Sequence, residues 1–161
     1  MVVAMRPRFL LDGMLGSLTR WLRICGYDSE YRRDSSDDEL IETARRTGRI
    51  LLTRDEALAH RANREGVEAK YIVGANDIER LRLLSRTVGV ELSPESSRCP
   101  KCNHELAKVE KPEVKGKVPE GTFEAFEEFW LCAGCGSVFW RGSHWPKITS
   151  TLFEASRGSG E

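Results

Sequence analysis

Four of the five cysteines form two Cys-x-x-Cys pairs, a spacing that is typical of a zinc site. The four are Cys99, Cys102, Cys132 and Cys135. Because four thiolates fill a tetrahedral ion and leave no open coordination position, we predict a structural rather than a catalytic zinc. Two disulfides are the alternative, but disulfides are rare in the cytosol. His104 and His144 lie near the pairs in the sequence, and we interpret both as surface or RNA-contacting residues.

All seven aspartates precede residue 78, and five of them follow short apolar segments. These five are our candidate catalytic residues: Asp12, Asp37, Asp38, Asp55 and Asp77. Clustered carboxylates repel one another unless a cation or protons neutralise them, and oxygen ligands suit Mg²⁺ or Mn²⁺. Such an ion can activate a water for attack on a phosphodiester, without a serine or cysteine nucleophile. Each aspartate could instead serve only as a helix N-cap.

The elements that must position these aspartates alternate between strand and helix patterns over residues 1–92. Short apolar runs predict strands, and each run is followed by apolar residues at helical spacing. The apolar runs are residues 9–11, 50–53 and 71–73, and residues 27–31 give a weaker signal for a second strand. The alternation predicts an α/β fold with a mostly parallel sheet, whose strands end along one edge. The aspartates would therefore meet at that edge, far apart in sequence but close in space.

The sequence around two of the aspartates bears on their roles. Gly13 would let a ligand approach the backbone beside Asp12. Thr53 could cap the third helix, which would leave Asp55 free to face a ligand. We expect the divalent ion to be held by Asp12, Asp38 and Asp55, with Asp37 and Asp77 assisting.

Arginines near the predicted acidic edge are candidates for binding phosphate. Arg20 and Arg23 fall on the polar side of the first helix, and Arg54 directly precedes Asp55. A guanidinium group matches the geometry of phosphate oxygens. Ordinary solvated helix faces are the alternative explanation for arginines in this part of the chain.

Composition divides the chain into two modules and excludes several classes of protein. Arginine and aspartate dominate the first part, and lysine and glutamate the second. We place an α/β domain at residues 1–92, a zinc ribbon at 97–148 and a frayed tail at 149–161. The 25 basic residues balance the 25 acidic ones, so bulk charge neither indicates nor excludes a nucleic-acid partner.

The sequence contains no apolar run of the roughly 20 residues that a membrane span needs. No signal-peptide pattern opens it, so we expect a cytoplasmic protein without a membrane partner. Neither a P-loop nor a Gly-x-Gly-x-x-Gly motif occurs, so no nucleotide cofactor is expected.

Several sequence blocks resemble the PIN-like ribonucleases of the Mut-seven C-terminal type. They are Leu-Asp-Gly-Met-Leu-Gly at 11–16, Arg-Trp-Leu-Arg at 20–23, Asp-Asp-Glu-Leu at 37–40, Ile-Leu-Leu-Thr-Arg-Asp at 50–55, the two cysteine pairs, and Trp-Arg-Gly-Ser-His-Trp at 140–145. The resemblance covers residues 8 to 148. It implies a three-layer PIN fold followed by a zinc ribbon, and Mg²⁺- or Mn²⁺-dependent cleavage of RNA. We expect an endonuclease, although the sequence does not distinguish endonucleolytic from exonucleolytic action. It assigns acidic roles to Asp12, to Asp37 or Asp38, and to Asp55.

The resemblance also implies that the ribbon end helps to hold RNA. Arg141, His144 and Trp145 combine aromatic and polar groups suited to unpaired bases. Alternatively, Trp140 and Trp145 pack the ribbon against the first module. A non-catalytic RNA-binding adaptor, associated with the ribosome or tRNA, is the main alternative function, and the toxin of a toxin–antitoxin pair is a third. The sequence does not indicate the RNA target or the oligomeric state.

Overall fold

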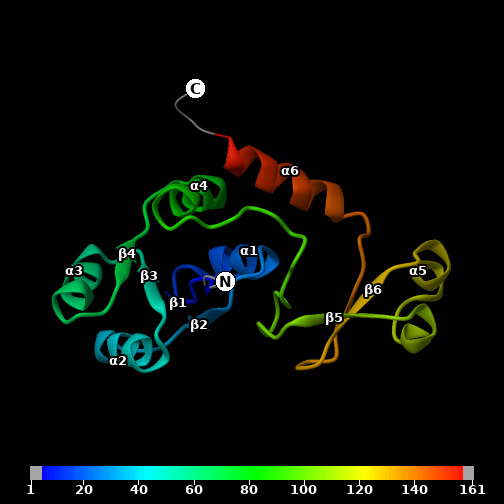
Figure 1. The fold of residues 1–161 in the computed structure, drawn as a ribbon, viewed down its shortest axis with the longest axis horizontal. Helices are drawn as coiled ribbons and strands as arrows, with labels where there is room; N and C mark the ends of the chain where they lie inside the picture. Colours follow the sequence, from blue (N-terminus) through cyan, green and yellow to red (C-terminus); the bar gives the residue numbers. More distant parts are fainter. Residues whose placement is uncertain (1–4, 158–161) are drawn as a thin grey trace, which may run out of the picture.

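The computed structural model describes residues 5–157 and contains two sheets, one parallel and one antiparallel (Figure 1). The parallel sheet has four strands: β1 (Phe9–Asp12), β2 (Ser29–Arg32), β3 (Ile50–Thr53) and β4 (Ala69–Tyr71). Four helices alternate with them: α1 (Gly16–Ile24), α2 (Asp37–Thr47), α3 (Glu56–Arg64) and α4 (Asp77–Thr87). The predicted alternation of strands and helices is confirmed.

The parallel strands lie in the order β2-β1-β3-β4. Phe9 is opposite Ser29 on one side and Ile50 on the other, so all three strands begin at one level. The predicted β4 is shifted: it begins at Ala69, because Leu51 of β3 pairs with Ala69. All strands therefore end along one edge, where the aspartates follow.

Helices cover both faces of this sheet, which confirms the predicted three layers. Leu10 and Leu51 point to one face and pack against α2 and α3, through residues such as Leu40 and Leu58. Phe9, Leu11 and Leu52 point to the other face, which α1 and α4 cover. The alternation follows from the two-residue period of a strand. Because both faces are buried, the two central strands, β1 and β3, are apolar at nearly every position.

Caps fix where the helices begin and end. Ser36 caps α2 by accepting a hydrogen bond from the backbone N–H of Glu39, whose side chain accepts one from the Ser36 N–H in return. Gly48 ends α2 with φ of 68°, a left-handed conformation that favours glycine. These local signals place Asp37 and Asp38 in the first turn of α2.

The second sheet carries the cysteine pairs. It consists of β5 (Leu106–Val109), β6 (Phe129–Cys132) and β7 (Val138–Phe139), all antiparallel. The excursion between β5 and β6 contains a 3₁₀ helix, η1 (Lys111–Val114), and a short helix, α5 (Glu120–Ala125). Residues 111–119, whose lysines and prolines are typical of an extended, exposed loop, are therefore not extended throughout. Val114 is buried and anchors the excursion.

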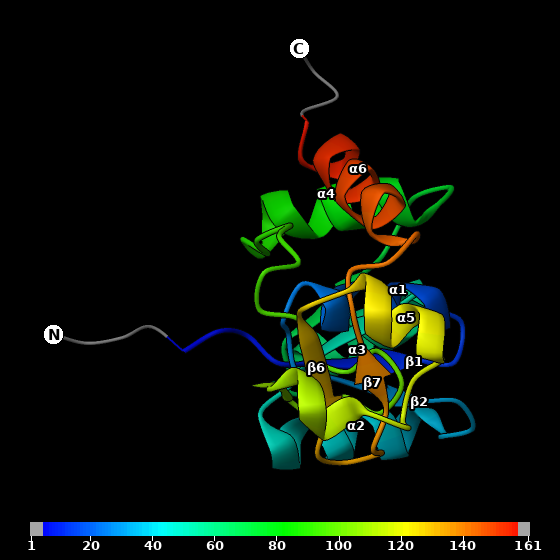
Figure 2. The same cartoon turned by 90° about the vertical axis from the view of Figure 1, so that its right-hand side faces the viewer.

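The predicted frayed tail is corrected by the structure. The last helix, α6 (Trp145–Ser156), returns from the ribbon to the first module and packs on α4 (Figures 1 and 2). Leu152 and Ala155 are each 1% exposed and belong to the same core as Leu81 and Leu84. With Ile148 they form an apolar stripe at helical spacing, which drives docking. Residues 158–161 of the predicted tail lie outside the described residues.

The two modules are joined by partly buried hydrogen bonds as well as by α6. Asn103, next to the first cysteine pair, donates to Asp28 Oδ1 over 2.6 Å and accepts from the Ser29 N–H over 2.9 Å. Arg49 also donates to Asp28 Oδ1, over 2.8 Å. Burial alone would raise the pKa of Asp28, but the hydrogen bonds from Arg49 and Asn103 outweigh it and hold the pKa below its ordinary value.

Replacing Asp28 with Asn is expected to lower stability at neutral pH by about 1–2 kcal/mol, because two hydrogen bonds lose their charged acceptor. The folded-state pKa is depressed, so the carboxylate stabilises the fold above its ordinary pKa of 3.8, and this contribution is lost as pH falls through the lowered value. Denaturant unfolding should therefore show a constant difference between wild type and variant above about pH 5, which shrinks below about pH 4. A difference that persists unchanged at lower pH would contradict this account.

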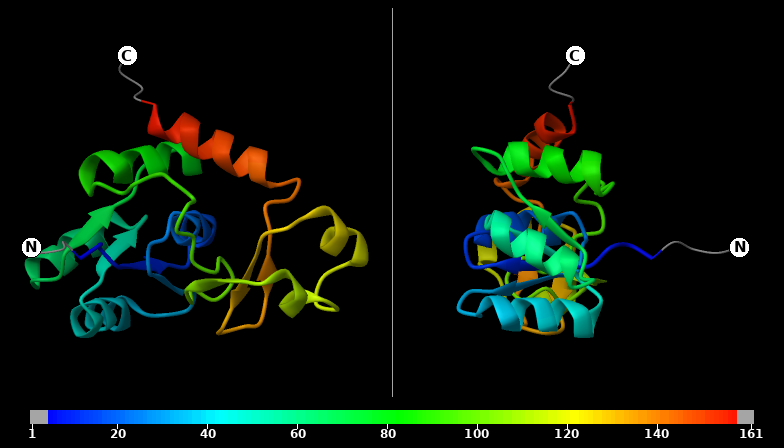
Figure 3. Two further views of the ribbon diagram at one scale, coloured as in Figure 1. Left: turned by 45° about the vertical axis from the view of Figure 1, so that its right-hand side comes forward. Right: turned by 90° about the vertical axis from the view of Figure 1, so that its left-hand side faces the viewer.

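No helix within residues 5–157 is long and apolar enough to cross a membrane. Views from other sides show the parallel sheet and the ribbon next to each other, with α6 bridging them (Figure 3).

Candidate functional site

The carboxyl ends of β1 and β3 are joined by a hydrogen bond between Asp12 and Thr53. Asp12 is the last residue of β1 and is only 9% exposed. Its Oδ2 accepts from the Thr53 hydroxyl, and its Oδ1 accepts from the Met14 N–H over 3.1 Å. Both carboxylate oxygens are therefore fixed in position at the edge of the sheet.

Asp55 is connected to this pair through Thr53. The Thr53 hydroxyl accepts from the Asp55 N–H over 3.0 Å, while Asp55 Oδ1 accepts from the Leu58 N–H over 3.1 Å. Asp55 itself is thus the N-cap of α3, and the expectation that Thr53 caps this helix is wrong. Thr53, which the sequence-based prediction did not include among the site residues, links Asp12 to Asp55.

The pair Asp12 and Asp55 lies at the point where the strand order reverses. From β1 the chain moves outward to β2, and then crosses to the other side of β1 to form β3. In such sheets the helices after the two central strands leave on opposite faces, and ligands bind in the crevice between them. Gly13 closes one side of this crevice: a Cβ there would lie 2.6 Å from the Arg33 carbonyl oxygen. The close approach that Gly13 permits is therefore with the chain's own backbone.

Asp37 and Asp38 lie at the same end of the sheet, at the start of α2. Both are exposed in the first turn of α2. Asp38 forms an ion pair with Arg61 of α3, and its side chain is 79% exposed. The structure therefore brings Asp38 to α3 rather than to Asp12.

Asp77 is the first residue of α4 and has one oxygen with no hydrogen-bond partner within residues 5–157. This atom, Oδ1, is buried, and the nearest cation is Arg80 Nη1 at 3.5 Å. Asn76 caps α4 instead, by accepting from the Glu79 N–H. Because buried acceptors are normally satisfied, the free oxygen of Asp77 leaves capacity for a ligand.

Within the described part of the chain, no three carboxylates converge as closely as the cysteines do. The oxygen donors at this edge of the sheet are the Asp12 carboxylate, the Thr53 hydroxyl and the Asp55 carboxylate, and Asp55 is joined to Thr53 through its backbone N–H. Oxygen donors of this kind fit Mg²⁺ or Mn²⁺ and do not suit a soft metal. Mg²⁺ is usually bound by only one or two carboxylates, with waters and substrate phosphates completing its shell, so the donor set is compatible with such an ion.

The four cysteines of the ribbon form a site that can bind zinc. Cys99, Cys102, Cys132 and Cys135 have sulfur atoms within 4.8 Å of one another. Cys99 Sγ is 3.7 Å from Cys135 Sγ, and Cys102 Sγ is 3.3 Å from Cys132 Sγ. A tetrahedral ion with Zn–S bonds of about 2.3 Å places its sulfurs roughly 3.8 Å apart. All four are free thiols, so the disulfide alternative is not adopted.

The histidine between the ribbon's loops supports the first cysteine pair. His104 Nδ1 lies 3.4 Å from Cys102 Sγ, and its ring packs so closely on Gly134 that a Cβ there would be 2.3 Å away. His104 is nevertheless exposed, as predicted, so it contacts the first cysteine pair and keeps an accessible surface.

The three arginines predicted near the acidic edge differ in their surroundings. Arg20 is exposed and lines a shallow hollow with Lys101. Arg23 donates to the backbone carbonyls of Ser29 and Pro100, so it joins the modules. Arg54 donates to the carbonyls of Ile72 and Gly74 and holds the end of β4 against β3. Of the three, only Arg20 has its charge fully available to a ligand.

The predicted RNA-contacting residues of the ribbon end lie together at the start of α6. Arg141 lies between the rings of Trp130 and Trp145, at 5.2 and 4.5 Å from their centroids, and forms an ion pair with Glu95. His144 is exposed just before α6. Trp145 is partly buried, so it takes part in packing and also keeps an accessible face.

Cys25 is not a nucleophile in this structure. It is 1% exposed, and burial raises the pKa of its thiol to about 12. A thiol with such a pKa is protonated at neutral pH and therefore inert.

Comparison with known families identifies the chain. A family model described as the Mut7-C RNAse domain matches residues 7–152. The chain belongs to the Mut7-C RNAse domain family. No curated protein and no solved structure matches the chain.

Membership of the Mut7-C family confirms the resemblance found in the sequence and indicates a ribonuclease-type function, with RNA as the substrate. The match includes the aspartates that follow the parallel strands, the four cysteines and the first half of α6. The α/β domain and the ribbon therefore fall within one family unit, and a single function has to account for both.

Proposed function

We propose that this protein is a metal-dependent ribonuclease of the PIN type that hydrolyses RNA phosphodiester bonds as an endonuclease. Asp12 and Asp55 form the centre of the site, Asp38 is the third ligand of an Mg²⁺ or Mn²⁺ ion, and Asp37 and Asp77 assist. The observation that carries the proposal is the position of Asp12 and Asp55, joined through Thr53 at the reversal of strand order.

The side chains of this site have separate tasks. Thr53 accepts from the Asp55 N–H and donates to Asp12, so it keeps the Asp12 carboxylate facing the crevice. Asp38 is exposed and held only by Arg61, so it can turn from α3 to the crevice when an ion is present. The buried oxygen of Asp77 is a further acceptor for a water. Arg20, with its exposed guanidinium, is suited to a phosphate of the RNA beside the scissile bond.

The divalent ion, when bound, supplies an activated water and stabilises the charge that develops on the phosphodiester. Asp12 and Asp55, at the carboxyl ends of neighbouring strands, provide negative charge that selects and holds a cation. The protein contributes no covalent nucleophile, in agreement with the inert Cys25.

Zinc, bound by the four cysteines, has a structural task in this proposal. It orders the ribbon, which presents Arg141, His144 and Trp145 to RNA. Reduced thiols are needed for this site, for which we propose the cytoplasm as the compartment.

The proposal is tested by the dependence of cleavage on divalent cations. Protein exchanged into buffer without Mg²⁺ or Mn²⁺, with its zinc content verified by elemental analysis, should not cut a mixed RNA. Addition of Mg²⁺ or Mn²⁺ should restore cleavage, with internal fragments as products on a gel. Equal cleavage with and without these ions would contradict the role assigned to the aspartates.

One observation favours a different function. Asp38 is paired with Arg61 and Asp55 caps α3, as would be expected if the aspartates only stabilised helices. The protein would then be a non-catalytic adaptor that binds RNA, such as tRNA or ribosomal RNA, through the ribbon. In that case the protein binds RNA with and without added Mg²⁺ and does not cut it.

A further inference from the structure

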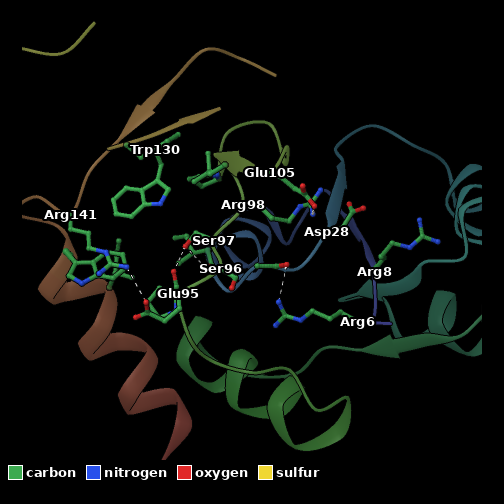
Figure 4. A pocket seen from close by; sticks show the side chains of 18 of the residues that line it. Arg6, Arg8, Asp28, Glu95, Ser96, Ser97, Arg98, Glu105, Trp130 and Arg141 are labelled. Carbon is green, nitrogen blue, oxygen red and sulfur yellow. Dashed lines mark hydrogen bonds and ion pairs between the residues drawn. The ribbon is translucent and has the colours of Figure 1, made fainter. Parts of the chain in front are cut away.

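A cavity of about 820 Å³ lies between the two modules, away from the aspartates. Its wall combines the segment before β1, the linker at residues 94–98, strands β6 and β7, and the start of α6. This volume is within the range of about 300–1,000 Å³ that is usual for ligand pockets. Figure 4 shows Arg6 and Arg8 toward one end of the cavity and Trp130 and Arg141 toward the other.

Aromatic side chains are concentrated at this cavity. Three of the four tryptophans of the chain line it, Trp130, Trp140 and Trp145, together with Phe139. All four rings are partly buried, so each keeps some accessible surface. The indole of Trp130 extends from β6 toward the segment of Ser96 and Ser97 (Figure 4). Accessible aromatic faces are the surfaces on which unpaired bases stack.

The charged groups of the cavity leave a net positive field. Each of its three carboxylates already has an arginine partner: Asp28 pairs with Arg49, Glu95 with Arg141, and Glu105 with Arg98.

Arg6 and Arg8, in contrast, donate only to backbone carbonyls within residues 5–157 and pair with no carboxylate there. Arg6 also lies over the Tyr27 ring at 3.9 Å, which holds its guanidinium flat at the cavity wall. The guanidinium of Arg8 is held at the carboxyl end of α2 by its bond to the Thr47 carbonyl, so Arg6 is the arginine suited to a phosphate of a nucleotide chain.

We propose that this cavity binds an unpaired segment of the RNA substrate. Bases would stack on Trp130 and its neighbours, and a phosphate would contact Arg6. The inference rests on the proposed function for its choice of RNA. A duplex keeps its bases stacked inside a helix, whereas a single strand can insert them one by one into a concave pocket. The cavity therefore selects single-stranded RNA.

The cavity that would bind RNA lies at a different place on the protein from the aspartates that would cleave it. Arg6 and Arg8 precede β1 and Asp28 precedes β2, so the cavity lies at the amino ends of the strands. Asp12 and Asp55 lie at the carboxyl ends. An RNA bound in the cavity must continue along the protein to reach the aspartates. A mononucleotide cannot occupy both places, so it should bind far more weakly than a longer strand.

The tryptophans themselves provide the measurement. A twelve-residue oligouridylate is titrated into full-length, zinc-loaded Asp12→Asn protein, and quenching of tryptophan fluorescence is followed. Trp130→Ala in the same background should weaken the Kd between about 5-fold and about 100-fold, the loss expected for one stacked base. Phe153→Ala is the matched control, because Phe153 is an exposed aromatic on α6 outside the cavity.

A second variant, outside the ribbon, tests the inference independently of any misfolding that Trp130→Ala causes in the ribbon. Arg6→Gln should weaken binding and reduce the slope of log Kd against log salt by about 0.7, the loss of one phosphate contact to a single strand. Lys147→Gln, an exposed change on α6 away from the cavity, should leave the slope unaltered.

The inference is overturned if both Trp130→Ala and Arg6→Gln bind the oligonucleotide as tightly as their parent. It is also overturned if uridine monophosphate binds as tightly as the twelve-residue strand, since the cavity would then be a mononucleotide site. Failure of the proposed function has a different signature: the native protein does not cut RNA with Mg²⁺, while binding to the cavity is unaffected.

Discussion

Replacing Asp12 with Asn is expected to reduce RNA cleavage at least about 100-fold, with little effect on the fold. The magnitude follows from the loss of a fixed charge at the site where negative charge develops and a cation must be held. Asp12 is nearly buried and accepts from both Thr53 and Met14, so its orientation is set before substrate binds. Initial rates on a labelled single-stranded RNA, with Mg²⁺ or Mn²⁺ present, give the measurement.

The stability of the Asp12→Asn variant needs to be followed separately. An amide in place of the carboxylate leaves one oxygen to serve two donors, which should cost about 1–2 kcal/mol in denaturant unfolding. Glu124→Gln, an exposed change on α5, is the matched control and should cut at the wild-type rate. If the Asp12→Asn variant also cuts at that rate, Asp12 has no part in the reaction.

Most of the parallel sheet could be predicted from the sequence, because its signals are local. Apolar runs located β1 and β3, which are central strands buried on both faces. The predicted limits of β4 were less accurate, because β4 is an edge strand whose extent depends on its pairing with β3. The apolar run in the sequence continues to Val73. Because Leu51 pairs with Ala69, the strand begins and ends earlier in the sequence than the run predicts.

The positions of the aspartates were predictable, but their partners were not. Topology alone places Asp12 and Asp55 at one edge, because each follows a parallel strand. The ion pair between Asp38 and Arg61 connects side chains on two different helices, and no local sequence pattern predicts it. The hydrogen bond between Thr53 and Asp12 also could not be predicted from local sequence, because the two residues become neighbours only when β1 pairs with β3.

The docking of α6 and the cavity beside it required the three-dimensional structure for a different reason. The apolar stripe of Ile148, Leu152 and Ala155 was visible in the sequence and could have indicated a helix. Its target, the face of α4, could not be deduced, because any unpaired apolar face would satisfy such a stripe. Trp130 and Arg6 line the same cavity only because the ribbon and α6 are folded against the first module.

Replacing Cys99 with Ser is expected to abolish stoichiometric zinc binding and to unfold the ribbon. Structural zinc supplies about 10–16 kcal/mol of folding free energy in small zinc domains, far more than the short strands β5 to β7 can provide alone. Cys99 is 0% exposed, so a change there also affects a buried position of the ribbon. Zinc per chain by elemental analysis and a thermal unfolding curve give the measurement. Cys25→Ala, a change at the buried cysteine outside the zinc site, should keep full zinc content.

The loss should extend from the ribbon to the junction with the first module. Asn103 lies in the turn after Cys102 with φ of 76°, a conformation that is uncommon outside glycine and that the zinc-bound turn holds in place. Its side chain makes the junction hydrogen bonds to Asp28 and Ser29. Without zinc the turn relaxes, these bonds are lost, and the cavity at the junction opens. Cys99→Ser should therefore also lose oligouridylate binding at the tryptophans, whereas a variant that lost zinc but retained this binding would contradict the connection.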